Sequence, residues 1–247
     1  STGNIFVGGD LNLHNPGNPG VGNNEADKNQ GADRTKIILV LAANPGRTSK
    51  LELDREFREI EEGLRRAKQR DRFELRSRWA VRLWDIRRAL LDVEPHIVHF
   101  IGHGAEDGLK VEDELGFAVT VSPEALSGLF ELFSNKVECV LLNACYSAIQ
   151  ADSIGRHIDY VIGMQKEIKN KAAIEFSVGF YDAIGAGRPV EEAFKFGCNA
   201  IRMKFPDQLE HLVPVLKKGG ITPDRYEIVP RSMDKQNRDV MLYNPSG

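Results

Sequence analysis

Short runs of aliphatic residues recur along the central part of the chain, separated by longer segments in which apolar and polar positions follow a helical period. The runs lie at 36–43, 97–101, 137–142 and 160–163, and they end at Gly, Pro or small residues. Runs of this length, rich in β-branched and aliphatic side chains, are typical of strands buried in a parallel sheet. A further segment, 73–78, alternates apolar and charged residues, which predicts an outer strand with one face in water.

Between these strands, apolar side chains recur at spacings of three and four residues, as on one face of an amphipathic helix. The first such face consists of Leu53, Phe57, Ile60, Leu64 and Ala67. Similar patterns predict helices at 84–91, 123–133, 147–156, 171–184 and 190–203, and a polar hairpin at 108–121. Strands that alternate with helices predict an α/β fold, with a mostly parallel sheet covered by helices on both faces.

The two ends of the chain have a different composition. Eleven of the nineteen residues at 15–33 are Gly, Asn or Pro, and such a segment buries too little apolar area to offset the entropy of ordering it. We therefore predict a short N-terminal β tag at 1–14, a flexible linker at 15–35, the α/β domain at 36–220 and a C-terminal extension at 221–247. A short strand at 226–229 is a candidate within that extension.

Composition narrows the class of protein. The 247 residues are 41% hydrophobic, enough for a sizeable core, and the formal net charge of −3 argues against non-specific binding of nucleic acid. Three cysteines without framework spacing are typical of free thiols in a reducing cytoplasm. No apolar run approaches 18 residues, so we expect a cytoplasmic protein without a membrane span.

Two candidate catalytic residues follow just after two of the predicted strands. His103 follows the strand at 97–101, and Cys145 follows the strand at 137–142. Because sites in open α/β sheets form at the carboxyl ends of strands, we expect these two side chains to meet at one edge. An imidazole can accept the proton of a neighbouring thiol, so the pair is a candidate nucleophile and base. Taken singly, His103 is also compatible with a strand-ending turn, and Cys145 with a small buried residue.

The same residues carry a resemblance. His103-Gly104 after one strand and Asn143-Ala144-Cys145 after a later one resemble the caspase-like cysteine peptidases of clan CD, and most closely their bacterial CHAT family. The segments 158–164 and 176–187 are similar to that family's following strand and helix, and 36–45 is similar to its opening strand. Caspases place the histidine about 50 residues before the cysteine; here the separation is 42.

The resemblance implies a caspase-like three-layer sandwich and a Cys–His dyad of Cys145 and His103. It also implies that the backbone N–H groups of Gly104 and Cys145 form the oxyanion hole. The position of Asn143 lines the pocket for the P1 side chain, the residue just before the scissile bond. An uncharged Asn there predicts a P1 residue that is apolar or polar but neutral, unless other pocket residues decide specificity. Met164 and Gln165, which end the next strand, are further candidates for this pocket.

Several other signals are absent or incomplete. Gly46 to Lys50 stand where a phosphate-binding loop would lie, but they lack its spacing and ending. No Cys-x-x-Cys or His-Glu-x-x-His occurs, so we predict no metal and no cofactor. Some relatives use calcium, but the acids at 112–114 are typical of a solvated hairpin tip. His99, four residues before His103, is expected to be a core histidine.

We therefore expect a cysteine endopeptidase that cleaves a partner protein. The CHAT resemblance implies a regulated effector of a bacterial antiviral defence or cell-death system, activated by a sensor protein or domain. Two other hypotheses stay open. One is a catalytically silent caspase-like adaptor that docks proteins, and the other is a nucleotide-binding or signalling α/β domain without protease chemistry.

Overall fold

The computed structural model describes residues 35–219 of the chain, and its centre is a six-stranded sheet. The strand order is β2-β1-β3-β7-β8-β9, in which every neighbouring pair is parallel except β8 and β9. The strands are β1 (Lys36–Ala42), β2 (Phe73–Trp79), β3 (Ile97–Ile101), β7 (Cys139–Asn143), β8 (Tyr160–Met164) and β9 (Pro214–Lys218).

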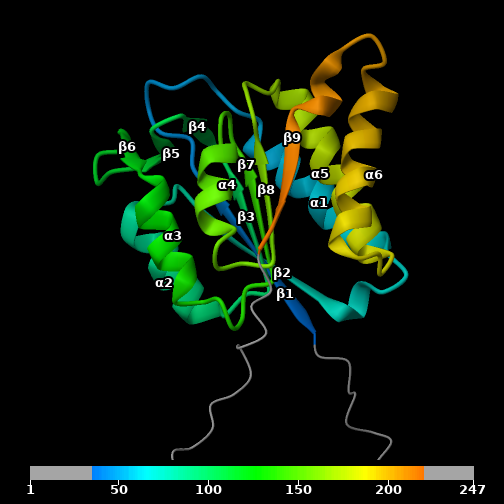
Figure 1. Cartoon of the computed structure of the whole chain (residues 1–247), viewed down its shortest axis with the longest axis horizontal. Helices are drawn as coiled ribbons and strands as arrows, with labels where there is room; N and C mark the ends of the chain where they lie inside the picture. Colours follow the sequence, from blue (N-terminus) through cyan, green and yellow to red (C-terminus); the bar gives the residue numbers. More distant parts are fainter. Residues whose placement is uncertain (1–34, 220–247) are drawn as a thin grey trace, which may run out of the picture. The chain divides into compact units, whose positions relative to one another are not determined.

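Helices cover both faces of this sheet (Figure 1). One layer consists of α2 (Leu83–Val93), α3 (Pro123–Glu131) and α4 (Ala148–Ile154). The other consists of α1 (Leu53–Arg66), α5 (Asn170–Gly185) and α6 (Val190–Lys204). The arrangement is the predicted three-layer α/β sandwich.

The two layers pack against alternate side chains of each strand, because successive residues of a strand point to opposite faces. In β1, Leu39 and Leu41 join the core under α2, α3 and α4, whereas Ile38 and Val40 join the core under α1, α5 and α6. The central strands β3 and β7 are buried along their whole length. This double burial explains why they appear in the sequence as continuous apolar runs.

A small antiparallel sheet follows β3 directly. It consists of β4 (His103–Ala105), β5 (Gly108–Glu112) and β6 (Ala118–Val121), in the order β4-β5-β6. The predicted hairpin at 108–121 corresponds to β5 and β6. Ser122 then caps α3, since its hydroxyl oxygen accepts a hydrogen bond from the N–H of Ala125 at 3.2 Å.

Every buried strand and helix predicted above is present, and β2 is the predicted outer strand at the edge of the sheet. Strand β9 was not predicted. It is short, begins at a proline, carries two lysines and pairs on one side only, so its segment lacks the pattern of a buried strand. The predicted tag, linker, C-terminal extension and strand at 226–229 fall almost wholly outside the described residues.

Candidate active site

The register of two neighbouring strands brings His103 and Cys145 to the same edge of the sheet. Ile101 at the end of β3 pairs with Asn143 at the end of β7, and the N–H of Gly102 donates to the carbonyl of Asn143 at 3.3 Å. His103 and Cys145 each lie two residues beyond this pair. Both side chains line one cleft of about 620 Å³.

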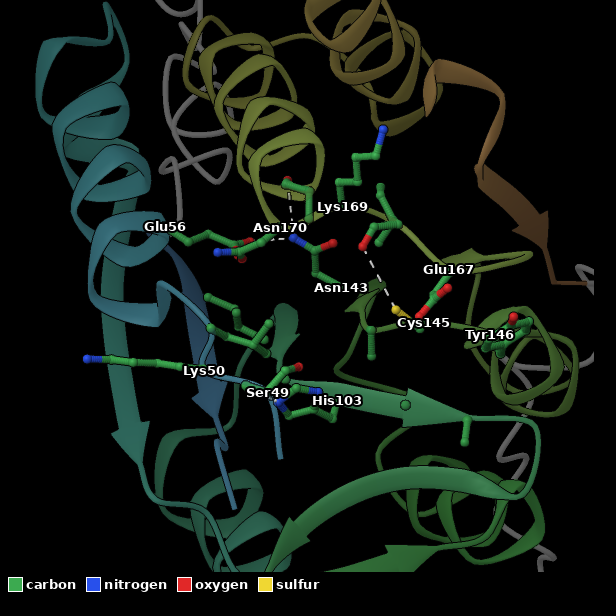
Figure 2. A pocket seen from close by; sticks show the side chains of 18 of the residues that line it. Ser49, Lys50, Glu56, His103, Asn143, Cys145, Tyr146, Glu167, Lys169 and Asn170 are labelled. Atoms are coloured by element: carbon green, nitrogen blue, oxygen red, sulfur yellow. Dashed lines mark hydrogen bonds between the residues drawn. The ribbon is translucent and has the colours of Figure 1, made fainter. Parts of the chain in front are cut away.

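His103 is held by acceptors at the rim of this cleft (Figure 2). Its Nε2 lies 2.9 Å from the carbonyl oxygen of Ser49 and 3.1 Å from Oδ1 of Asn44. A carbonyl oxygen can only accept, so Nε2 carries the proton and Nδ1 of the neutral ring is free to act as a base. Burial lowers the pKa of His103, partly opposed by the hydrogen bond to Ser49, and so favours this neutral form.

Cys145 is half-buried on the opposite wall of the cleft, and its sulfur points to the carbonyl oxygen of Ile168 at 3.9 Å (Figure 2). Burial raises the pKa of the Cys145 thiol, and the nearby carboxylates of Glu167 and Glu210 raise it further. The thiol is therefore protonated at neutral pH in this structure. Within residues 35–219, no backbone oxygen accepts a hydrogen bond from the N–H of Cys145, which leaves that donor available.

Gly104 in β4 packs closely against the backbone of Cys145. A Cβ added at this position would collide with the carbonyl oxygen of Cys145 and would lie 3.0 Å from the Cβ of Ala144. Glycine is therefore required here for backbone packing against Cys145. Tyr146, the next residue after the cysteine, has a φ of 57°, a left-handed conformation that non-glycine residues adopt rarely and that is often found at functional turns.

Asn143 lies at the bottom of the cleft and is 4% exposed. Its amide nitrogen donates to Oε1 of Glu56 at 2.5 Å and also lies 3.2 Å from both the carbonyl of Ala173 and the hydroxyl of Ser177. Its Oδ1 is buried and has no hydrogen-bond partner among the described residues. The sequence interpretation treated Asn143 in isolation, whereas the structure couples it to a buried carboxylate.

Met164 and Gln165 do not line this cleft, in contrast to their expected place in the substrate pocket. Met164 is fully buried in the core under α5, and its N–H donates to the hydroxyl of Ser147 at 2.9 Å. Gln165 donates through its backbone to Val213 and through its side chain to the carbonyl of Leu212. Pairing of β8 with the segment that leads into β9 thus holds both residues away from the cysteine.

Three residues of the site were missed by the sequence analysis: Asn44, Ser49 and Glu56. The first two follow β1 and position His103. The burial of Glu56 could have been predicted from the sequence. This residue falls three residues after Leu53 and four before Ile60, on the apolar face of the predicted helix. A carboxylate on a buried helical face requires polar partners, and Glu56 is 2% exposed.

His99 is the core histidine that was expected. It is fully buried, with Nδ1 3.2 Å from the hydroxyl of Tyr181 and Nε2 3.4 Å from Oε1 of Glu56. It therefore belongs to the polar network beneath the cleft. Among the described residues, no group of three or more His, Cys, Asp or Glu side chains is placed to hold a metal ion. None of the helices in residues 35–219 is both long and apolar enough to span a membrane.

Solved structures with the same fold are caspase-like cysteine proteases. The chain superimposes on gingipain R (RgpB), described as an Arg-specific cysteine proteinase, with a TM-score of 0.54 and 12% identity over 76% of this chain and 46% of that one. It superimposes on caspase-1 from Spodoptera frugiperda with a TM-score of 0.51 and 11% identity, over 75% and 87% of the two chains. At such identities the likeness establishes a caspase-like fold.

Sequence comparison identifies the family. The family model for the CHAT domain matches residues 21–202, so this chain belongs to the CHAT domain family. The match begins within the predicted linker and ends before the predicted domain end. A probable protease from Gillisia limnaea is 27% identical over 205 residues, which cover 77% of this chain. The chain spans only 36% of the length of that relative.

Proposed function

We propose that this chain is a cysteine endopeptidase of the caspase type, with Cys145 as nucleophile and His103 as general base. The observation that carries the proposal is the placement of these two side chains in one cleft, each two residues beyond a paired position of neighbouring parallel strands. The caspase-like fold and the CHAT family add support, as does the relative described as a probable protease.

His103 is prepared for the base role by its hydrogen bond to Ser49. That bond fixes the proton on Nε2 and leaves the lone pair of Nδ1 available. Since the sulfur of Cys145 points to Ile168 in this structure, attack requires rotation about its χ1 from one staggered position to another. Catalytic hydrogen bonds are often long or misaligned until substrate binds, so this resting geometry is compatible with the mechanism.

In the proposed reaction, the thiol proton moves to Nδ1 of His103 as the sulfur forms a bond to the scissile carbonyl carbon. The carbonyl π electrons move to oxygen, and the N–H groups of Cys145 and Gly104 stabilise the oxyanion. Collapse of this intermediate breaks the C–N bond, and the imidazolium returns its proton to the leaving amine. Water, deprotonated by His103, then attacks the thioester and releases the thiol and the carboxylic acid.

The proposal extends to the cellular role of this peptidase. We infer a cytoplasmic effector of a bacterial antiviral defence or cell-death system that cleaves a partner protein after activation by a sensor. The resting state described above, with a protonated thiol turned from its base, is consistent with an enzyme that requires activation. We infer no cofactor and no direct contact with nucleic acid or membrane.

The test is incubation of the chain with candidate substrate proteins encoded beside it, followed by mass spectrometry of new termini. We expect new termini with the unmodified protein, and none with Cys145→Ala, with His103→Ala or after treatment with a thiol alkylator. Cys198→Ala is the matched control, because Cys198 lies on α6 outside the cleft, and it should cleave normally. Cleavage that persists in Cys145→Ala would refute the proposal, and partner binding without cleavage would favour the adaptor hypothesis.

A further inference from the structure

The floor of the cleft contains an unsatisfied acceptor whose direction is fixed by its surroundings. The amide nitrogen of Asn143 faces Oε1 of Glu56 and the carbonyl of Ala173, both of which can only accept hydrogen bonds from it. The amide therefore cannot be flipped, and Oδ1 must point the other way. Figure 2 shows the Asn143 nitrogen directed to Glu56 and its oxygen directed away from that residue. This oxygen is buried and has no partner among residues 35–219.

Beside it lies a buried carboxylate that meets only groups able to be neutral. Oε1 of Glu56 accepts hydrogen bonds from Asn143 and from the hydroxyl of Ser177 at 2.6 Å, and it lies 3.4 Å from Nε2 of His99. The Nε2 of His99 has no hydrogen-bond partner among the described residues, so its approach to Glu56 is a close contact and not a hydrogen bond. No Lys or Arg in the described chain forms an ion pair with Glu56.

One ion pair lies at the rim of the cleft. Lys169 lies 3.4 Å from Glu210 and 2.8 Å from the side-chain oxygen of Gln208. Lys50 and Glu167 are exposed, and Figure 2 shows the Lys50 side chain extending away from Cys145. The lining thus has three carboxylates and two ammonium groups. Neither Glu56 nor Glu167 forms an ion pair with Lys or Arg among the described residues, and of these two Glu56 is the buried one.

We propose that Glu56 and Asn143 form a P1 subsite that selects a positively charged side chain, lysine or arginine. The inference rests on the proposed peptidase function, and it replaces the expectation of a neutral P1 residue that was drawn from Asn143 alone. Asn143 lines the same cleft as Cys145 and lies two residues before it, at the position that the caspase-like resemblance assigns to the P1 pocket. Lysine and arginine bring only donors, which match Oδ1 of Asn143 and the Glu56 carboxylate.

Acidic and apolar P1 side chains would interact less favourably with Glu56 and Asn143 at the bottom of the cleft. An acidic side chain would bring acceptors to a floor that already consists of acceptors, beside a carboxylate of the same charge. An apolar side chain would leave Oδ1 of Asn143 buried without a donor and Glu56 without a cation, and burying unpaired polar groups is unfavourable. Sites built to hydrogen-bond a substrate group reject analogues that lack it more strongly than they reject a change of size.

The first test measures binding alone and needs no turnover. Benzamidine carries the donor and charge of an arginine side chain, and benzamide is its neutral counterpart of nearly the same shape. We expect benzamidine to bind the unmodified protein at least roughly tenfold more tightly than benzamide in an NMR titration, with shifts at Asn143 and Glu56. The same preference should persist in Cys145→Ala. Equal binding of the two compounds, or shifts confined to the rim, would overturn the proposal.

The second test uses matched variants. Glu56→Gln replaces the buried carboxyl group by an amide of almost the same volume, whereas Glu167→Gln replaces an exposed carboxyl group of the same cleft. Benzamidine binding should fall to the level of benzamide in the first variant and stay within about twofold of normal in the second. If Glu56→Gln unfolds, the comparison in the unmodified protein still decides the question. Retained discrimination in a folded Glu56→Gln protein would exclude Glu56 as the determinant.

The third test links the subsite to cleavage. Peptides that differ only at P1, with arginine or its neutral isostere citrulline and with lysine or norleucine, are compared by kcat/KM. We expect roughly a 100-fold preference for each cationic residue, lost in Glu56→Gln but not in Glu167→Gln. Cys145-dependent cleavage without this preference would overturn the subsite and leave the peptidase intact. Selective benzamidine binding without cleavage of any peptide would instead refute the proposed function and leave a cation site.

Discussion

Ile101 and Asn143 are partners in neighbouring parallel strands, and this pairing aligns the two segments that contain His103 and Cys145. The chain leaves both strands in the same direction, so the next residues of each segment enter one cleft. His103 and Cys145 are brought together in this way although no local contact connects them. Parallel pairing accounts for their meeting, and the hydrogen bonds of their neighbours decide which way each side chain points.

The three cysteines should differ in reactivity. Cys139 is fully buried in β7, and burial raises its thiol pKa far above the ordinary value. Burial raises the pKa of Cys198 to about 11. We expect iodoacetamide at pH 8 to modify Cys145 first, Cys198 more slowly and Cys139 only after unfolding, as measured by peptide mass spectrometry. Modification of Cys139 ahead of Cys145 in the folded protein would contradict the described burial.

The alkylation rate of Cys145 should depend steeply on pH. Because its pKa is raised, the thiolate fraction is small at neutral pH and grows as pH rises through that pKa. We expect the rate constant at pH 7 to lie about 30-fold or more below its plateau in the free protein. The measurement is the iodoacetamide rate from pH 6 to 10. A plateau already reached below pH 7 would show instead a thiolate–imidazolium pair in the resting state.

Gly104→Ala should damage both stability and activity. The added methyl group would collide with the carbonyl of Cys145, and overpacking of this kind costs about 1–3 kcal/mol of unfolding free energy. Displacement of the Cys145 backbone should also lower cleavage strongly. The matched control is Gly128→Ala in α3, where no atom lies within 4 Å of the added Cβ.

That control should be neutral or more stable by about 0.5–1 kcal/mol, because alanine favours a helix over glycine. Urea denaturation midpoints of the two variants are the measurement. If Gly104→Ala were as stable and active as the parent, the close approach of Gly104 to Cys145 would be wrong.

Ser147→Ala should destabilise the turn that follows the cysteine. The buried hydroxyl of Ser147 donates to the carbonyl of Leu142 at 2.8 Å and accepts from the N–H of Met164 at 2.9 Å, so it ties β7 to β8. Its loss leaves both backbone groups buried and unpaired, at a cost of about 1–3 kcal/mol.

Ser153→Ala serves as the comparison for this effect. The Ser153 hydroxyl only donates to the carbonyl of Ile149 within its own helix, at 3.3 Å, and its removal should change stability by less than about 0.5 kcal/mol. Thermal and urea denaturation of both variants are the measurements. Equal stability of the two variants would argue against the link from Ser147 to both strands.

Much of the architecture could be predicted from local pattern, since a strand buried on both faces and an amphipathic helix each leave a periodic signal. His103 and Cys145 could be placed at one edge because parallel strands end on the same side of a sheet. Strand β9 escaped prediction because a short edge strand with a proline and lysines has no such signal.

The polar groups around His103 and Cys145 come from distant segments of the chain. Glu56 and Asn143, which form a hydrogen bond, are 87 residues apart in the sequence. Ser49 and His103, which also form one, are 54 residues apart. No spacing in the sequence encodes which acceptor a histidine will find, or which carboxylate will lie beneath an asparagine. Packing of α1 and α5 on the sheet brings Glu56 to Asn143, and the segment between β1 and α1 brings Ser49 to His103. Both contacts exist only once distant parts of the chain have packed together.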